Sequence, residues 1–317
     1  MTTAVAGEVP PREETREKPR EKAREKVGPL APVAPLSPRA EVLRAALIVV
    51  LVVSVSLMLE LLVLSGLQQR AAQQRLFDSF REQLALGTAP TGPTDLNGDV
   101  LALGDPVAYL EVPAIGLRQV VVEGTLPGTL FDGPGHRRDT PLPGQEGTSI
   151  IMGRRAAFGG PFARIADLDE GDRIRLTTGQ GTYTYRVSGV RHDGDRAPGA
   201  PAEGRSRLIL ATADGAAFVP NGVVRVDAKL RKDADSGPAR LVTVATLPAG
   251  EQFMASDTST LFALVLWLQL LIALVAAFMW AWHRWSRAKA WVVFLPPLLL
   301  VGLLMSNEAA RLMPNLL

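Results

Sequence analysis

Two adjacent arginines are the most chemically suggestive pair in this sequence. Arg154 and Arg155 follow the apolar run 150–152 and a single glycine, which puts positive charge at the end of an expected strand. Guanidinium groups suit a carboxylate or phosphate ligand, because they offer planar, charge-assisted hydrogen bonds. The alternative is that both side chains form salt bridges with Asp or Glu of their own domain. Arg225, on a later apolar segment, is a third candidate for the same ligand.

Nucleophiles and proton carriers are scarce. The chain has no cysteine and only three histidines. His136 lies in a Gly-Pro-Gly-His turn, where we expect a structural role, although it remains a ligand candidate. His192 with Asp193 and Asp195 is more typical of a solvated turn than of a cation site. Asp214 ends an apolar segment, and no base is assignable to it.

Sequence motifs for a replacement chemistry are also missing. The chain contains no Gly-x-Ser-x-Gly, His-Glu-x-x-His or Walker pattern. We therefore predict no metal site, no cofactor and no substitute catalytic centre.

Three apolar runs predict helices that cross a membrane. Residues 44–67 and 261–282 are almost unbroken aliphatic sequence, and about 20 such residues match the thickness of a bilayer. Residues 290–306 are shorter and carry Pro296 and Pro297, so they form either a third span or a re-entrant hairpin. Glu60 is costly in lipid and should face a partner or the protein interior. Its place near the end of its run also allows snorkelling.

Basic residues set the predicted orientation. Residues 1–43 are rich in Pro, Arg, Lys and Glu, a composition that predicts a disordered tail. This tail and the segment between the second and third runs carry Lys and Arg, which favour the cytoplasmic side. We expect a multi-pass plasma-membrane protein with a cytoplasmic N-terminus and residues 68–260 outside. A net charge of +2 gives no case for nucleic acid.

The part outside the membrane reads as a helix followed by strands. Residues 68–105 predict a stalk helix and a linker. Residues 106–230 hold several short apolar segments separated by Gly, Pro, Asp and Asn, which predict a mainly β fold and a closed β-barrel. Residues 231–260 read as a tether with one added edge strand at 240–245.

Ordered motifs in the barrel segment resemble those of a known family. Residues 110–117 read Leu-Glu-Val-Pro-Ala-Ile-Gly-Leu, residues 133–136 read Gly-Pro-Gly-His, and residues 158–162 read Phe-Gly-Gly-Pro-Phe. In this order and spacing they resemble sortases, closest to the actinobacterial class E type. The resemblance implies a membrane-anchored transpeptidase with a Cys nucleophile, a His acid and an Arg that stabilises the oxyanion.

The same resemblance places the catalytic positions on residues that cannot perform this reaction. Arg154 stands at the His position, Ala213 at the Cys position and Val223 at the Arg position, with Arg225 two residues further on the same strand face. An alanine methyl cannot attack a carbonyl carbon. An arginine stays charged near neutral pH and cannot shuttle protons. We therefore expect a degenerate member, a pseudo-sortase.

The sequence thus predicts a catalytically inactive, sortase-like membrane protein at the cell surface. Its barrel would keep a groove and serve as a binding or assembly module. Expected partners are the membrane and either a peptide or another membrane or cell-wall protein. The alternative is an active cell-wall transpeptidase or hydrolase with a non-standard mechanism. The ligand-binding candidates are Arg154, Arg155, Arg225, Asp214 and His136.

Overall fold

The computed structural model describes residue 3 and residues 37–317, so most of the predicted tail lies outside the described residues. The first helix begins at Pro38, inside the segment that was predicted to be tail. Residues 42–317 form one compact unit.

Three helical stretches in the described residues are long and apolar enough to cross a membrane. The first is continuous from Arg39 to Leu86, so the membrane segment and the stalk are one helical rod with a π-helical turn, Glu60–Leu64, in its middle. It ends at Gly87, whose φ of 69° suits glycine. The helices are α1 (Pro38–Leu59), α2 (Ser65–Leu86), α3 (Leu261–Arg284) and α4 (Arg287–Arg311).

The third predicted span is a single helix and not a re-entrant hairpin. α4 runs for 25 residues with Pro296 and Pro297 inside it. Proline is tolerated in membrane helices, because neighbouring helices and local adjustments satisfy the carbonyls that it frees. The pair of prolines therefore does not break the helix here.

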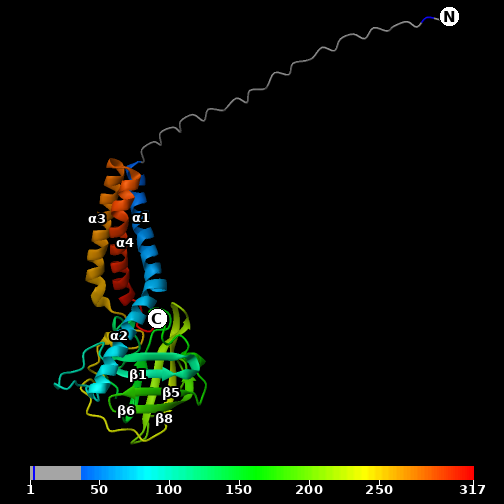
Figure 1. The fold of residues 1–317 in the computed structure, drawn as a ribbon, viewed down its shortest axis with the longest axis vertical. Coiled ribbons are helices and arrows are strands. Elements are labelled where there is room, and N and C mark those ends of the chain that lie inside the picture. Colours follow the sequence, from blue (N-terminus) through cyan, green and yellow to red (C-terminus); the bar gives the residue numbers. More distant parts are fainter. Residues whose placement is uncertain (1–2, 4–36) are drawn as a thin grey trace. The chain divides into compact units, whose positions relative to one another are not determined.

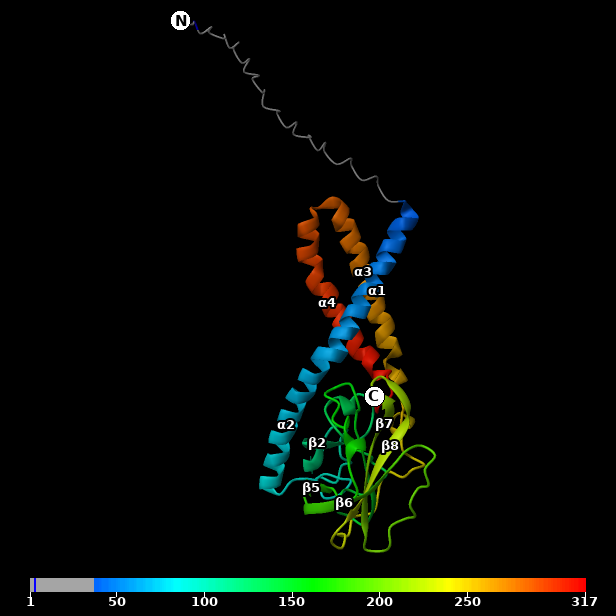
Figure 2. The ribbon, with the colours of Figure 1, turned by 90° about the vertical axis from the view of Figure 1, so that its right-hand side faces the viewer.

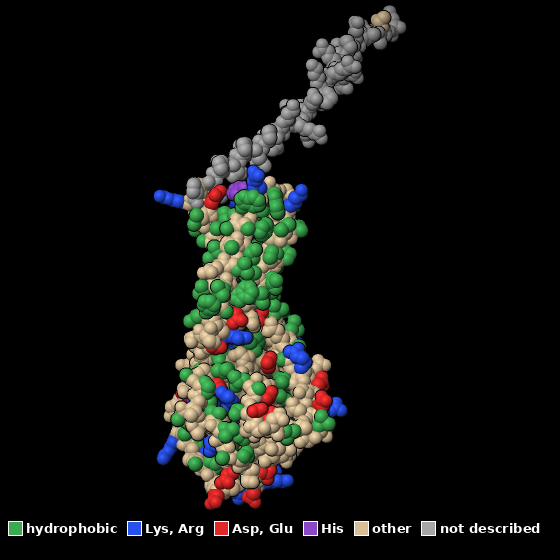
Figure 3. All heavy atoms as spheres, turned by 90° about the vertical axis from the view of Figure 1, so that its left-hand side faces the viewer, with side chains coloured by type: hydrophobic (Ala, Val, Ile, Leu, Met, Phe, Trp, Pro, Cys, Tyr) green, Lys and Arg blue, Asp and Glu red, His purple; other side chains and the backbone are tan. Residues whose placement is uncertain are grey.

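α1, α3 and α4 pack along one another through an apolar seam (Figures 1 and 2). On the face seen in Figure 3, most side chains along these helices are hydrophobic, and Lys and Arg gather at their end away from the barrel. An outer surface of this kind suits lipid. The buried residues of the seam are Leu271, Val275, Leu298, Val301 and Met305.

The π-helical turn joins the membrane helices to the barrel. Glu60 is 1% exposed and accepts a hydrogen bond from Nε2 of Gln68 at 3.2 Å, so it faces the protein interior. Leu61, in the same turn, packs against Phe131 and Phe158 of barrel loops. A π-turn widens the helix locally and marks a site of altered packing.

The strands form a closed eight-stranded barrel in the order β1-β2-β3-β4-β7-β8-β6-β5. The predicted closed barrel, with one N-terminal and two C-terminal apolar helices, is confirmed. β4 and β7 are parallel neighbours although 53 residues separate their ends, and this pairing creates the face on which the site lies. The strands are β1 (Pro106–Val112), β2 (Leu117–Glu123), β3 (Gly135–His136), β4 (Gly147–Met152), β5 (Arg173–Thr178), β6 (Gly181–Arg191), β7 (Ser206–Ala216) and β8 (Val219–Leu230).

Two local predictions about strands were wrong. Residues 240–245 form turns and not an edge strand. The Gly-Pro-Gly-His motif supplies the short strand β3, where it was expected to be a turn. A Cβ on Gly135 would lie 2.1 Å from the carbonyl oxygen of Gly124, so this close contact requires glycine. Because glycine has a low propensity for strands, the sequence did not predict a strand here.

We predict that Gly302 controls the packing of α4 on α1. A Cβ at this position would lie 2.3 Å from Oγ of Ser56. Gly302→Val should therefore lower the free energy of unfolding by about 1–3 kcal/mol through overpacking. Thermal unfolding in detergent can be followed by Trp fluorescence, because all five tryptophans lie at positions 267–291, in α3, α4 and their turn.

The matched control for this prediction is Gly66→Val. Gly66 is also helical, but a Cβ there meets nothing within 4 Å. Its effect should stay within about 0.5 kcal/mol. Equal effects of the two substitutions would contradict the close approach of the helices.

Candidate functional site

The residues of the candidate site lie on the outer face of the barrel wall formed by β4, β7 and β8. Side chains alternate along a strand, so Leu208 and Leu210 of β7 point into the barrel core while Ala211 and Ala213 point outward. Ala213 pairs with Val223 of β8, and Ala211 pairs with Met152 of β4. The predicted nucleophile and arginine positions are thus direct neighbours.

The segment that follows α4 covers this face. Leu316 and Leu317 are 0% and 5% exposed and pack in one cluster with Met152, Ala213 and Val223. Phe253 and Met254, from the predicted tether, pack against the same cluster. The small side chains of Ala211 and Ala213 leave room for Leu316 and Leu317, which cover the outward face of these strands.

Hydrogen bonds fix the covering segment at three consecutive residues. Asn315 donates from its backbone N–H to the Ala255 carbonyl at 2.8 Å, and from Nδ2 to the carbonyls of Thr125 and Gln252. The carbonyl of Leu316 accepts from the backbone N–H of Arg155 at 2.9 Å. Residues 314–317 form a turn closed by the Leu317 N–H and the Pro314 carbonyl.

Arg154 lies beneath this segment and is completely buried. Its two terminal nitrogens each donate at 3.0 Å, Nη1 to the Leu317 carbonyl and Nη2 to the Pro127 carbonyl. The guanidinium carbon lies 4.8 Å and 5.1 Å from the rings of Phe131 and Phe158, which stack on one another. Burial lowers the pKa of Arg154 to about 9, so the group is still charged at neutral pH.

Arg154 does not form the salt bridge that was considered for it, since no Asp or Glu side chain is paired with it among the described residues. Its fully buried side chain contacts backbone oxygens of the chain instead of solvent. Its charge is instead stabilised by carbonyl dipoles and aromatic faces. Arg155 is partly exposed and donates from Nη1 to the Ala213 carbonyl at 3.2 Å. This hydrogen bond stabilises the C-terminal part of β7.

Arg225 has an acidic partner. Its Nη1 lies 2.7 Å from Oδ1 of Asp193, and its guanidinium carbon lies 5.0 Å from the Phe253 ring. The Arg225 side chain holds the pKa of Asp193 below its ordinary value. Arg225 therefore positions the residues that cover the site, on the same strand face as Val223.

Asp214 and His192 form an exposed pair at the rim. Oδ2 of Asp214 and Nδ1 of His192 lie 2.6 Å apart, and this contact lowers the pKa of Asp214. Asp195 accepts from the His192 backbone N–H, whereas Asp193 pairs with Arg225. The trio considered as a cation site is thus split among other partners. Over the described residues, no three His, Asp or Glu side chains form a metal-binding group.

His136 lies in the barrel wall and not in the site. Its Nδ1 is 2.8 Å from Oε2 of Glu123 and its Nε2 is 3.0 Å from the Pro141 carbonyl. Burial by itself would lower the pKa of His136, but the Glu123 carboxylate beside it raises the pKa overall. Both ring nitrogens face acceptors, which favours the doubly protonated ring.

Comparison with known proteins identifies this barrel. The model of the sortase domain family matches residues 110–225, from β1 into β8. We refer to residues 110–225, which are similar to this family, as the sortase domain. The matched region includes all of the candidate site residues, whereas the covering segment, Phe253 and Met254 lie outside it.

Individual relatives share parts of this domain. Sortase D of Bacillus subtilis (strain 168) is 33% identical over 84 residues, which are 26% of this chain and 41% of that protein. The chain thus spans less than half of the length of this curated relative. Sortase E from Streptomyces avermitilis has 29% identity, covering 42% of this chain and 91% of that chain, with a TM-score of 0.36. The Clostridium perfringens Sortase D5 transpeptidase has 20% identity, covering 51% and 99%, with a TM-score of 0.43.

One open cavity adjoins the covered face of the sortase domain. Its volume is about 420 Å³, and Ile150 belongs both to its lining and to the covered cluster. The ion pair of Arg137 with Asp139, at 2.8 Å, lies in its wall. The covering leucines do not line this cavity.

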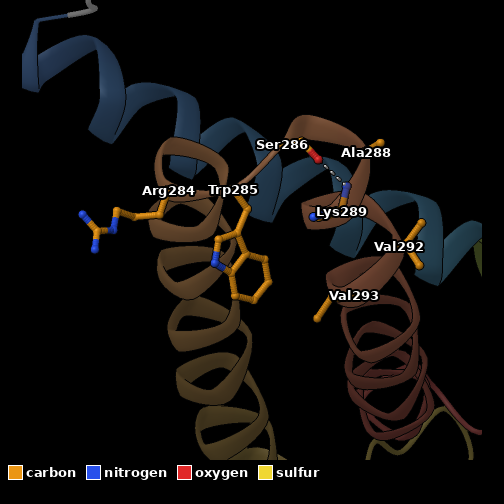
Figure 4. A pocket seen from close by; sticks show the side chains of 7 residues that line it. All are labelled: Arg284, Trp285, Ser286, Ala288, Lys289, Val292 and Val293. Carbon is orange, nitrogen blue, oxygen red and sulfur yellow. Dashed lines mark hydrogen bonds between the residues drawn. The ribbon is translucent and has the colours of Figure 1, made fainter.

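A larger cavity, of about 740 Å³, lies at the turn between α3 and α4 (Figure 4). There the Trp285 ring points into the space between the two helices, and Ser286 caps α4 by accepting from the Lys289 N–H. Val292 and Val293 supply its apolar side. None of the predicted site residues lines this cavity, so size alone does not locate the site.

Sequence reasoning missed the covering residues. After Arg311 the sequence offers the apolar pairs Leu312-Met313 and Leu316-Leu317, which are equally typical of the end of a membrane helix. The packing of Phe253 against the site was not predicted, because the residues around it show neither strand nor helix periodicity. Long-range contacts of this kind leave no trace in local patterns.

We predict that Arg154 supports the sortase domain structurally. Arg154→Ala should leave the Leu317 and Pro127 carbonyls without a donor and cost about 3 kcal/mol or more. The control Arg155→Ala removes one partly exposed side chain and should cost about 1 kcal/mol. Hydrogen exchange of amides in β4 and β7, in the full-length chain in detergent, reports these losses. A neutral Arg154→Ala would contradict the structural role.

We also predict a pH dependence from His136. Its raised pKa means that its ion pair stabilises the folded state fully below about pH 6.5, the ordinary value for histidine. This contribution is lost as the pH rises through the higher pKa of the folded state. Exchange of amides in β2–β4, corrected for intrinsic rates, should therefore show less protection at alkaline pH.

The control for this pH effect is His136→Gln. The variant should be less stable at acidic pH than the unmodified chain and should lack the loss of protection as the pH rises above the ordinary pKa of histidine. Protection that increases with pH in the unmodified domain would contradict the charged His136–Glu123 pair.

Proposed function

We propose that this chain is a catalytically inactive, sortase-like membrane protein whose barrel acts as a binding or assembly module at the cell surface. Ala213 carries the proposal. By resemblance it stands at the nucleophile position, its side chain is a buried methyl group, and the chain has no cysteine that could take its place. Acyl transfer through a thioester needs a thiolate, which a methyl group cannot replace.

The surroundings of Ala213 support this proposal. At the proposed position of the acid, the Arg154 guanidinium is engaged with two carbonyls and has no exposed surface. At the proposed position of the oxyanion-stabilising arginine, Val223 is apolar and packs against the covering leucines. The face is therefore suited to holding a peptide segment and not to breaking one.

We further propose the orientation that the charges favour. Arg44 lies 4.9 Å from the Trp282 ring, so the start of α1 and the α3–α4 turn share one end of the helices. That end also carries Arg284 and Lys289. Excess Lys and Arg favour the cytoplasmic side of a plasma membrane. The sortase domain would then lie outside, where a peptide or a cell-wall protein is the natural class of partner.

We predict no transpeptidation or hydrolysis by the unmodified chain. The test uses the full-length protein in detergent with fluorogenic sorting-signal peptides, and a sortase with an intact cysteine as the positive control. Turnover above background by the unmodified chain would overturn the proposal and favour an active enzyme of non-standard mechanism. The double variant Ala213→Cys, Arg154→His tests whether restoring the thiol and the imidazole is sufficient for activity.

A further inference from the structure

The outer face of the sortase domain already holds a peptide, which is part of the same chain. In Figures 1 and 2 the end marked C lies where α4 meets the barrel. The turn 314–317 sits there with Asn315 and Leu316 fully buried. The covered cluster contains Ala213, which is the proposed position of the nucleophile.

The contacts of this turn are those of a recognised ligand. The backbone or the side chain of every residue from Asn315 to Leu317 has a hydrogen-bond partner in the sortase domain or in residues 252–255. The side-chain amide of Asn315 donates to two backbone carbonyls. The side chains of Leu316 and Leu317 pack in one cluster with Ala211 and Ala213. Such a set of directed polar contacts around an apolar pair gives specificity as well as affinity.

The turn is held only by non-covalent contacts. Burial of Leu316 and Leu317 and the hydrogen bonds of the turn favour the docked state, whereas the conformational entropy that the backbone loses on docking opposes it. A peptide in trans must still compete with a tethered segment whose effective concentration is on the order of millimolar.

We infer that residues 313–317 are an internal, exchangeable ligand of the groove, and that the groove binds peptide turns in which a side-chain amide precedes two aliphatic residues. The inference rests on the proposed binding function and deepens it. It assigns the class of ligand and adds a self-occupied state in which α4 is held on the barrel. An external peptide of the same kind gains access only when the internal turn leaves.

The absence of native cysteine makes a direct test possible. Ala213→Cys provides a single thiol beneath the turn, and Val219→Cys provides an exposed reference at a position that is 68% exposed. In the full-length chain in detergent, a maleimide should label Ala213→Cys at least about tenfold more slowly than Val219→Cys. Equal rates would overturn the inference, because the thiol would then not be covered.

Releasing the turn should expose this thiol. Leu316→Asp with Leu317→Asp should raise the labelling rate of Ala213→Cys to near that of the reference. Added peptide Met-Pro-Asn-Leu-Leu should then slow the labelling again, whereas Met-Pro-Asn-Asp-Asp should not. If the first peptide gives no protection at millimolar concentration, the turn is not an exchangeable ligand and the inference is wrong.

A second control separates release from unfolding. Ala228 lies in the barrel core and is 0% exposed, so Ala228→Cys should stay unlabelled in every background. If the aspartates expose it, the milder pair Leu316→Ala and Leu317→Ala is used, and the same two peptide outcomes decide. The labelling rate is independent of turnover, so an unexpected enzymatic activity would refute the proposed function while leaving this measurement intact.

Discussion

A buried cation without an Asp or Glu partner must be surrounded by backbone oxygens and aromatic faces, and Arg154 is such a cation. Its two carbonyl partners, Pro127 and Leu317, come from a barrel loop and from the segment after α4. The aromatic faces come from Phe131 and Phe158, against which the π-turn of the first helix also packs. The charge therefore fixes the barrel, the first helix and the end of the last helix around one point.

The proposed loss of reactive side chains and the closure of the groove depend on one another. A thiol at the position of Ala213 needs access for a substrate and a solvated neighbour, whereas a methyl group tolerates leucines packed directly upon it. Val223 belongs to the same apolar cluster. An active sortase needs polar groups in a precise arrangement at these positions. In this chain the same positions form an apolar surface, and the residues packed on that surface are Leu316 and Leu317 of the chain itself.

Much of the fold was accessible from the sequence. Alternating apolar residues in segments such as 183–187 predicted strands, and the aliphatic runs predicted the helices, because both signals are local. β3 was hidden because Gly135 is there to permit a close contact and not for its strand propensity. The environment of Arg154 and the place of Leu317 were not predictable, since 163 residues separate these partners. The sequence could identify which residues stand at the site but not what covers it.

The short connection between α4 and the docked turn makes the sortase domain sensitive to the bilayer. Only three residues separate Arg311, the last residue of α4, from Asn315. At about 3.5 Å per residue, this connection allows little travel before the turn is pulled from its place. Hydrophobic mismatch changes the tilt of a membrane helix at modest energetic cost. With these helices in a bilayer and the turn as the proposed ligand, the thickness of the membrane would be coupled mechanically to whether the groove is filled or empty.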